Sequence, residues 1–177
     1  MPSVTSDAVR IDYPKLWFAA GSATDAMATA VMLFFAYDSV ETFARALWTA
    51  CALVIGVPIF LVLFPPLFTC HYVGEKGLRL RMGLLMNATV PFRLISGIGE
   101  SRVNYGPVTV GIGVKYVAKR RLVFVTSSFR RLVSIRLEGP QQLGSPLRPL
   151  VDQIIMSVED SEGFVALIKD RAGLLEG

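Results

Sequence analysis

The most constraining feature of this chain is an uncharged run of 23 residues from Ala46 to Phe68. About 20 consecutive apolar residues are enough to cross the hydrocarbon core of a bilayer. A buried helix of a soluble domain is the alternative, but a chain of 177 residues has too small a core to bury so long a run. We therefore expect a transmembrane helix over 46–68, with Pro58 as a candidate kink and Pro65-Pro66 near its end.

A second apolar run, residues 16–37, carries one charge, Asp25. A secretory signal peptide is the competing interpretation, but its apolar core is roughly 7–15 residues long and follows a basic start. This run is longer, and acidic residues of the preceding tail offset the two basic ones, so we expect a retained helix. Only residues 38–45 separate the two runs, which predicts an antiparallel hairpin over 15–68 after an N-terminal tail of residues 1–14.

The distribution of charge predicts the orientation of this hairpin. The segment after Phe68 holds 15 of the 18 Lys and Arg residues, whereas the connection between the runs holds Arg45 and two acidic residues. Positive residues near the membrane stay on the cytoplasmic side. We therefore expect a multi-pass protein of the cell membrane with both termini in the cytoplasm, and much of the net charge of +4 is then a topology signal.

Asp25 is the unusual residue of the first run, because a carboxyl group inside a bilayer costs roughly 2.5–3.5 kcal/mol on insertion scales. It lies beside a stripe of small residues, Ser22, Ala26 and Ala30, of the kind that lets helix backbones approach closely. Neither run contains a second charged residue, and Asp25 is about ten residues from Lys15, nearer one end than a midplane relay requires. The pattern favours a packing or assembly contact over ion or proton handling and over a partly hydrated interfacial position.

The pattern changes to a period of two after the second run. Leu78, Leu80, Met82 and Leu84 are expected on one face and Arg79 and Arg81 on the other, which indicates a half-buried strand. Further short strands are expected at roughly 69–75, 88–95, 98–104, 107–117, 121–127, 131–138 and 151–157. The final segment predicts a helix capped by Asp160, with Phe164, Ile168, Ala172 and Leu175 on one face.

Three stretches resemble the bacterial and archaeal pleckstrin-homology-like (PH-like) families that follow a pair of transmembrane helices: YVGEKGLRLRMG, VPFRLISGIGES and IIMSVEDSEGFVALI. The resemblance covers about residues 43–172 and implies a mainly-β PH-like barrel capped by a C-terminal α-helix, here a cytoplasmic domain over 69–177. Two features depart from the family. Arg93 stands where such proteins often have an acidic residue, and residues 139–150, with three prolines, predict a loop insertion that is either a partner contact or a plain insertion.

The sequence lacks the residue patterns of common catalytic and metal sites. It has no Cys-x-x-Cys, no His-x-x-x-His and no Ser-plus-His arrangement. His71 beside Cys70 falls at the membrane exit, where an interfacial position is the simpler interpretation. The glycines of YGPVTVGIGVKY lack the Gly-Lys-Ser/Thr ending of a phosphate-binding loop. We therefore expect a protein that is not an enzyme and needs no cofactor or metal.

Basic residues are the remaining candidates for a lipid- or partner-binding surface, each with solvated surface charge as the alternative. They are Lys76, Arg79, Arg81, Lys119, Arg120, Arg121, Arg130 and Arg131. Each basic residue near an anionic membrane contributes roughly 1 kcal/mol. Nucleic acid is not expected, because these clusters lack interleaved aromatic residues for base stacking.

Together these patterns predict a membrane-anchored docking module that recruits a protein, peptide or anionic-lipid ligand at the inner membrane face. The alternative is an accessory or assembly subunit of a larger membrane complex, held through Ser22, Asp25, Ala26 and Ala30. An ion- or proton-handling protein that uses Asp25 is a third hypothesis. The expected partners are membrane lipids together with a partner protein or further copies of the chain.

Overall fold

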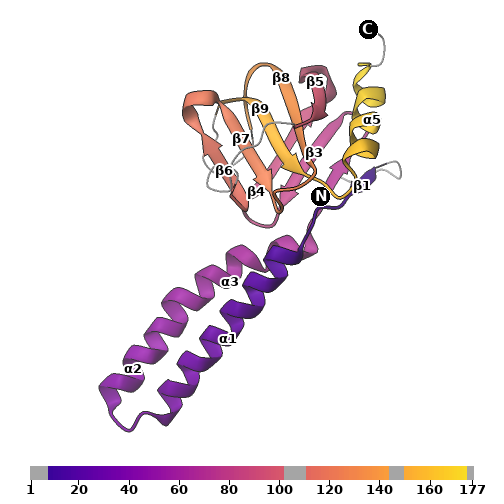
Figure 1. The fold of residues 1–177 in the computed structure, drawn as a ribbon. Coiled ribbons are helices and arrows are strands. Elements are labelled where there is room, and N and C mark those ends of the chain that lie inside the picture. Colours follow the sequence, from indigo (N-terminus) through magenta and orange to yellow (C-terminus); the bar gives the residue numbers. More distant parts are fainter. Residues whose placement is uncertain (1–7, 102–110, 144–149, 175–177) are drawn as a thin grey trace.

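A computed structural model describes residues 8–101, 111–143 and 150–174, and it consists of a helical hairpin and a domain of two β-sheets with a C-terminal helix (Figure 1). We call the second part the β-domain. It comprises the described residues after Phe68 and a short strand that precedes the hairpin.

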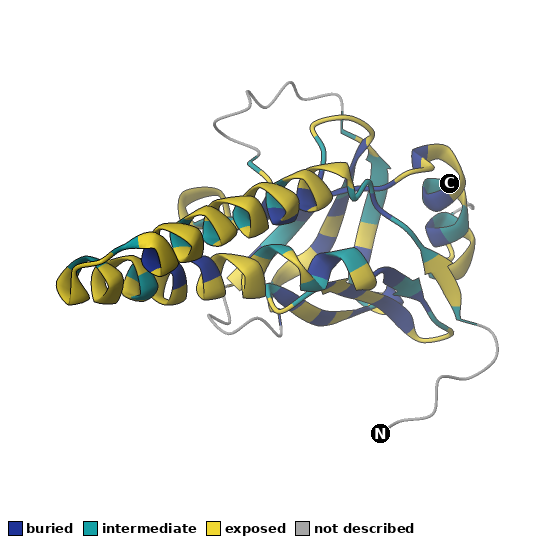
Figure 2. Ribbon diagram, turned by 90° about the horizontal axis from the view of Figure 1, so that it is seen from below, coloured by how far each residue is buried: buried dark blue, intermediate teal, exposed yellow. Residues whose placement is uncertain are grey.

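The hairpin consists of two helices that are long and apolar enough to cross a membrane, judged by length and composition. The first is α1 (Leu16–Asp38). The second, Thr42–Phe68, is built from α2 (Thr42–Cys51), a π-helical turn (Ala52–Gly56), α3 (Val57–Leu63) and a 3₁₀ turn (Pro65–Phe68). Most of their surface is exposed (Figure 2), and only 11% of each apolar window is buried inside the molecule. Neither helix is therefore the core helix of a soluble domain.

The prolines of the second helix lie at or next to its two irregular turns, and the expected end near Pro65-Pro66 is confirmed by the 3₁₀ turn Pro65–Phe68. The π-helical turn Ala52–Gly56 ends two residues before Pro58, which has no N–H to donate and whose ring crowds the preceding turn. The wider π turn provides the room that this ring needs. The helix begins at Thr42, four residues before the uncharged run, and Arg45 in its first turn donates to the Ser39 carbonyl at 2.9 Å.

Two sheets form the β-domain. The first has the order β1-β2-β3-β4 and consists of β1 (Val9–Ile11), β2 (His71–Val73), β3 (Gly77–Met82) and β4 (Met86–Pro91). The second has the order β5-β8-β9-β7-β6 and consists of β5 (Ile95–Glu100), β6 (Gly113–Val117), β7 (Leu122–Thr126), β8 (Leu132–Gln142) and β9 (Leu150–Ser157). Short 3₁₀ turns precede β5 (Phe92–Leu94) and β7 (Ala118–Arg120).

Two features of these sheets were not expected from the sequence. Residues 9–11 of the expected tail form β1, which pairs antiparallel with β2. Three residues are too few for an alternating pattern to be read. In addition, β7 pairs parallel with β9, whereas every other pair is antiparallel among the described strands.

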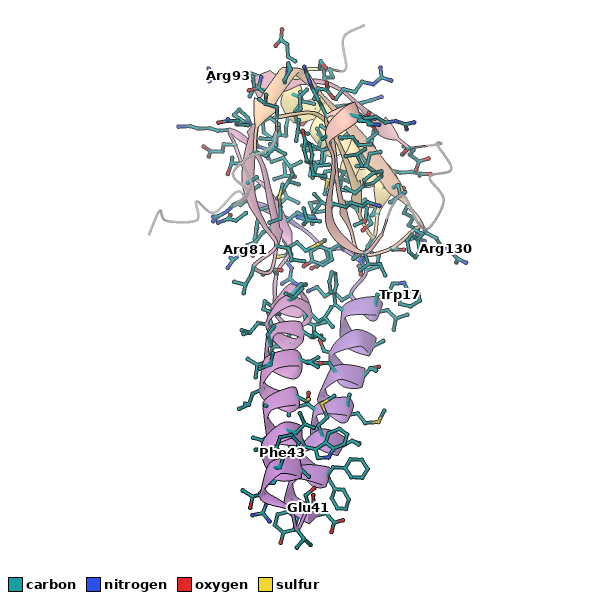
Figure 3. All side chains as sticks on the ribbon, turned by 90° about the vertical axis from the view of Figure 1, so that its left-hand side faces the viewer. Trp17, Glu41, Phe43, Arg81, Arg93 and Arg130 are labelled. Atoms are coloured by element: carbon teal, nitrogen blue, oxygen red, sulfur yellow. The ribbon has the colours of Figure 1, made fainter. Side chains whose placement is uncertain are left out.

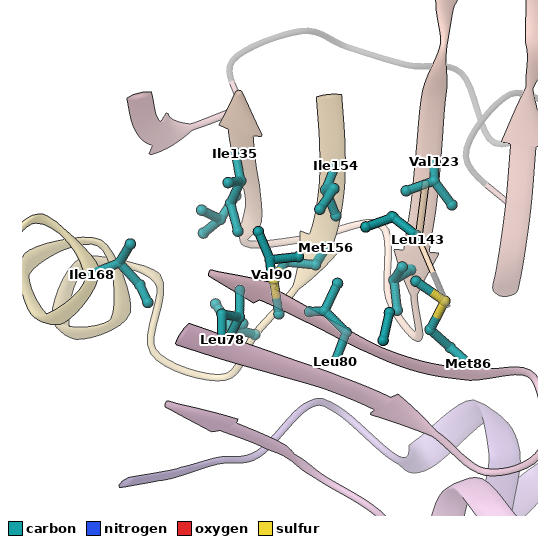
Figure 4. Packing of buried hydrophobic residues seen from close by; sticks show 14 of the residues in the cluster. Leu78, Leu80, Met86, Val90, Val123, Ile135, Leu143, Ile154, Met156 and Ile168 are labelled. Atoms are coloured by element: carbon teal, nitrogen blue, oxygen red, sulfur yellow. The ribbon is translucent and has the colours of Figure 1, made fainter. Parts of the chain in front are cut away.

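The core lies between the two sheets and is closed by α5 (Ser161–Ala172) (Figure 4). Leu78, Leu80 and Val90 of the first sheet face Ile135 and Ile154 of the second. The alternating pattern is confirmed within β3, because Leu78, Leu80 and Met82 are fully buried while Arg79 and Arg81 are exposed on the outer face. It is wrong for Leu84, which is exposed because the strand ends at Met82 and Leu84 lies in the turn that follows.

The expected cap of α5 is confirmed. The Asp160 carboxylate accepts a hydrogen bond from the Gly163 N–H at 3.0 Å, and Phe164 and Ile168 are buried against the sheets. Ala172 packs against the same core, and Leu175 lies outside the described residues. Gly173 ends the helix with a φ of +67°, a left-handed conformation that favours glycine.

The loop expected over 139–150 is shorter in the structure. Strand β8 continues through Gln142, and β9 begins at Leu150, with Gln142 paired to Leu150. Gly139, at a φ of +73°, lies in a register shift between β8 and β9, which lets the strand resume beyond it. Residues 144–149 lie outside the described chain, as do residues 102–110 of two other expected strands.

The strand directions define two ends of the β-domain. Strand β3 ends next to the hairpin, because Gly83, which follows it, donates to Thr69 Oγ1 at 2.9 Å. Strand β9 also ends there, since the Glu159 N–H donates to the carbonyl of Asp12, just before α1. Strand β7 runs parallel to β9. We call this end the membrane-side end and the opposite end the far pole.

Candidate functional site

The junction between the hairpin and the β-domain is held by buried hydrogen bonds around Tyr13. The Tyr13 hydroxyl donates to the Pro66 carbonyl at 2.7 Å and lies 2.9 Å from Thr69 Oγ1. Thr69 in turn accepts the bond from Gly83. The Tyr13 ring packs edge-on against Phe18 of α1, and burial raises the pKa of Tyr13 to about 12. One residue therefore connects the two helix ends and the β3–β4 turn.

His71 is the polar residue at the centre of this junction. It is fully buried, with its ring centroid 5.0 Å from that of Tyr13, rather than at the interfacial position that the sequence indicated. Its Nδ1 accepts from the Arg81 N–H at 3.1 Å, so the proton of the neutral ring is on Nε2, which has no partner among the described residues. Burial lowers the pKa of His71 to about 4, against a smaller opposite effect of Asp12.

Both connections between the hairpin and the β-domain are short and structured. Four residues separate β1 from α1, and within them Tyr13 is buried. Two residues, Thr69 and Cys70, separate the second helix from β2, and both are buried. Since β1 and β2 also pair with each other, the hairpin and the β-domain are joined without a flexible linker.

The structure divides the candidate basic residues between the two ends of the β-domain. Arg81, near the end of β3, and Arg130, after β7, lie at the membrane-side end (Figure 3). Arg131 is fixed there by donating to the Glu159 carbonyl. Arg79 lies two residues before Arg81 in β3 and therefore farther from the hairpin, and its guanidinium is 3.4 Å from Asn87 Oδ1.

The other basic candidates lie at the far pole. Lys76 precedes β3, and its carbonyl accepts from the Phe92 N–H, which places it at the same corner as Arg93 (Figure 3). Residues 119–121 precede β7 and so lie at its far end. A strand of five residues spans about 17 Å, so the clusters at 119–121 and 130–131 lie at opposite ends of β7. The sequence left this arrangement open and did not include Arg93 among the candidates.

The hairpin separates the four residues that the sequence grouped around Asp25. Ser22 is buried between the helices, and its hydroxyl has no partner in the described chain. Asp25 is half-buried with one unpartnered buried oxygen, Oδ2, whereas Ala26 and Ala30 are exposed. Asp25 is two residues from the middle of α1, about 3 Å along the axis, and therefore closer to mid-helix than its distance from Lys15 suggested.

The closest approach of the two helices involves residues that the sequence analysis did not pair. A Cβ added to Gly56 would overlap the Thr29 hydroxyl, so the two backbones come together at these positions. Ala36 and Ala52 are buried along the same interface. Beside it lies an apolar hollow of about 360 Å³, lined by Asp25, Ala26, Thr29, Ala30, Leu33, Gly56, Val57, Phe60 and Leu61. The spacing of Ser22, Thr29 and Ala36 by seven residues is the signal that could have found this face.

Comparisons with known proteins identify no family for this chain. The sequence matches no family model, and neither the curated proteins nor the solved structures contain a match. Among the described residues, no three His, Cys, Asp or Glu side chains gather where they could hold a metal ion. Function is therefore inferred from the geometry of the chain itself.

Proposed function

We propose that this chain is a membrane-anchored docking module without catalytic activity, whose β-domain is a PH-like barrel held at the cytoplasmic face of the cell membrane. Two sheets around one core and a closing C-terminal helix support this fold. The parallel pairing of β7 with β9 and the additional strand β1 are its own features.

The observation that carries the proposal is the rigid junction at Tyr13. A docking domain on a flexible tether samples many orientations, whereas this one has a fixed orientation because Tyr13 binds Pro66 and Thr69 and because β1 pairs with β2. The far pole therefore always faces away from the bilayer. A partner that docks there is held at a defined height above the membrane.

The charge of the far pole indicates the chemistry of this partner. Its described basic residues include Lys76, Arg93, Lys119, Arg120 and Arg121 together with Lys169 and Arg171 in the last turn of α5, and its acidic residues include Glu75, Glu138, Asp152 and Asp170. A separation of about 17 Å from the membrane-side end exceeds the Debye length of about 8 Å at physiological ionic strength. Lipid headgroups of the same membrane are thus screened from these residues, and an acidic protein or peptide is the ligand that fits.

The proposal is tested by chemical crosslinking in native membranes, followed by mass spectrometry of the purified chain. We expect the double variant Lys119→Glu/Arg120→Glu to lose its crosslinked protein partner. The matched control, Arg81→Glu/Arg130→Glu, makes the same change in charge at the membrane-side end and should keep it. Equal loss in both variants would mean that net charge rather than the far pole recruits the partner, and no loss in either would refute the proposed docking surface.

A second candidate function, an accessory subunit of a larger membrane complex, is favoured by the hollow beside Asp25. A carboxyl oxygen without a partner in an apolar layer is costly, and a polar group from another helix could bind it. This function predicts a subunit of fixed stoichiometry that is lost with Ala30→Leu, which fills the hollow. The ion-handling hypothesis predicts instead that Asp25→Asn removes a membrane-dependent activity while leaving assembly intact.

A further inference from the structure

Exposed large apolar side chains are few on the β-domain, and most of them gather at one end. Among its described residues they are Val9, Leu84, Ile112, Phe129 and Leu150. Leu150 begins β9 and therefore lies at the far pole. Leu84, Ile112 and Phe129 lie in three separate chain segments at the membrane-side end, and we call them the membrane-side tips.

Leu84 is placed by the turn between β3 and β4. A Cβ on the preceding Gly83 would lie 2.6 Å from Pro66 Cδ, so the turn rests directly on the end of the second helix. Leu84, the next residue of this turn, is nevertheless 66% exposed. An exposed leucine therefore lies beside the end of a helix that is apolar enough to cross a membrane.

Ile112 and Phe129 are placed by strand β7. Its last residue, Thr126, pairs with Gly113 and donates to the Gly111 carbonyl at 2.8 Å, so Ile112 lies at the membrane-side end. Phe129 follows in the connection to β8, next to Arg130. Both side chains are 41% exposed.

Basic and aromatic groups complete this end of the molecule. Figure 3 shows Arg81 and Arg130 on opposite sides of it, close to the level of Trp17 at the start of α1, whereas Arg93 is at the other end. Trp17 and Phe68 are exposed at the two helix ends next to the β-domain. Aromatic side chains at such positions mark the interface between hydrocarbon and water, and basic side chains beside them face lipid phosphates.

We propose that the membrane-side tips insert into the interfacial layer of the leaflet where the hairpin enters, and that Arg81 and Arg130 bind the phosphates of anionic phospholipids there. The short junction leaves no linker that could hold the β-domain away from the bilayer. The partner is thus the surface of the membrane that the hairpin crosses. The contact is independent of the proposed docking at the far pole, since either can exist without the other.

Insertion of the tips is tested with the full chain in nanodiscs that contain brominated phospholipids, which quench nearby tryptophan. In a Trp17→Phe/Trp48→Phe background, Phe129→Trp and Leu84→Trp place single reporters on the tips, and Leu150→Trp is the matched control at the far pole. We expect lipids brominated close to the headgroup to quench the two tip reporters at least twofold more than the control. Equal quenching of tip and control reporters would overturn the proposal.

The lipid contact is tested by measuring which lipids stay bound after purification in mild detergent. One basic residue near an anionic surface changes the local affinity by at most about fivefold. We expect Arg81→Gln/Arg130→Gln to lower the ratio of anionic to zwitterionic lipid severalfold, whereas Lys119→Gln/Arg120→Gln leaves it at the wild-type value. An unchanged ratio in the first variant, or an equal loss in both, would show that these arginines do not bind lipid phosphate.

Discussion

The buried imidazole of His71 predicts how the stability of this protein depends on pH. Its Nδ1 accepts from the Arg81 N–H and its ring packs on Tyr13, in an environment that lowers its pKa to about 4. In the unfolded chain the pKa returns to its ordinary value of 6.5. Between these two values the unfolded state binds a proton that the folded state rejects. The contribution of His71 is therefore fully present above pH 6.5 and is lost as the pH falls toward 4.

The size of the effect follows from the two pKa values. At pH 5 the unfolded imidazole is almost fully protonated and the folded one is mostly neutral, which lowers the free energy of unfolding by about 2 kcal/mol relative to pH 7.5. For a chain of 177 residues such a loss corresponds to a melting temperature lower by roughly 4–8 °C. Carboxylates also titrate in this range, so the wild type alone does not isolate the histidine.

His71→Asn provides the comparison. The Asn amide oxygen can replace Nδ1 as the acceptor for Arg81, but the side chain does not titrate. We expect the variant to be less stable at pH 7.5 and to lose roughly 4–8 °C less than the wild type between pH 7.5 and pH 5. An equal fall in melting temperature between pH 7.5 and pH 5 for the two proteins would refute the role of His71.

The pKa itself can be measured directly, because His71 is the single histidine of the chain. In an NMR titration of the imidazole in nanodiscs, its signals should stay constant from pH 7.5 to about pH 5. A midpoint near 6.5 would show that the ring is exposed to water and that the junction is looser than its hydrogen bonds indicate.

Three further variants test other parts of the fold by thermal unfolding in detergent. Gly56→Ala should lower the free energy of unfolding by about 1–3 kcal/mol, because the added methyl group overlaps the Thr29 hydroxyl. Gly21→Ala, whose methyl group meets only the flexible Leu63 side chain, should lower it clearly less. Equal losses would refute the close approach of the two helices at Gly56 and Thr29. Tyr13→Phe should lower the free energy of unfolding by about 1–3 kcal/mol by leaving buried partners unpaired, whereas Tyr37→Phe, at an exposed position, should leave it unchanged. If neither variant lost stability, the hydrogen bonds of Tyr13 would not hold the junction. Asp160→Ala should lower the free energy of unfolding by about 1 kcal/mol through loss of the N-cap of α5, whereas Asp170→Ala in the last turn of α5 should not lower it. Equal losses would show that the Asp160 cap does not stabilise the helix.

The elements that could be predicted from the sequence are those with a local cause. The hairpin is visible because two apolar runs are long enough to cross a bilayer, and β3 is visible because Leu78 and Leu80 alternate with arginines. The cap at Asp160 depends on residues only three positions apart. Each of these signals lies within one element, so a window of a few residues contains it.

The parts that could not be predicted depend on contacts between distant residues. Tyr13 looks like one aromatic residue in a polar tail, yet it binds Pro66 and Thr69, more than 50 positions away. Val9 and Ile11 are β-branched residues that suit a strand, but three residues are too few to predict one, and β1 pairs with the edge of β2. Likewise, nothing in the sequence around the basic residues indicates at which end of the β-domain they lie.

The junction also determines what the separation of the basic residues means. Without Tyr13 and the pairing of β1 with β2, the β-domain could rotate on its connections, and any of its basic residues could reach the bilayer. With these contacts, Arg81 and Arg130 are held at the end of the β-domain next to the hairpin, and residues 119–121 are held at the opposite end. Under the two proposals above, one set of buried contacts thus directs similar residues to different partners, lipid at one end and an acidic protein or peptide at the other. A change that loosens the junction, such as Tyr13→Phe, should therefore weaken both interactions even though Tyr13 touches neither partner.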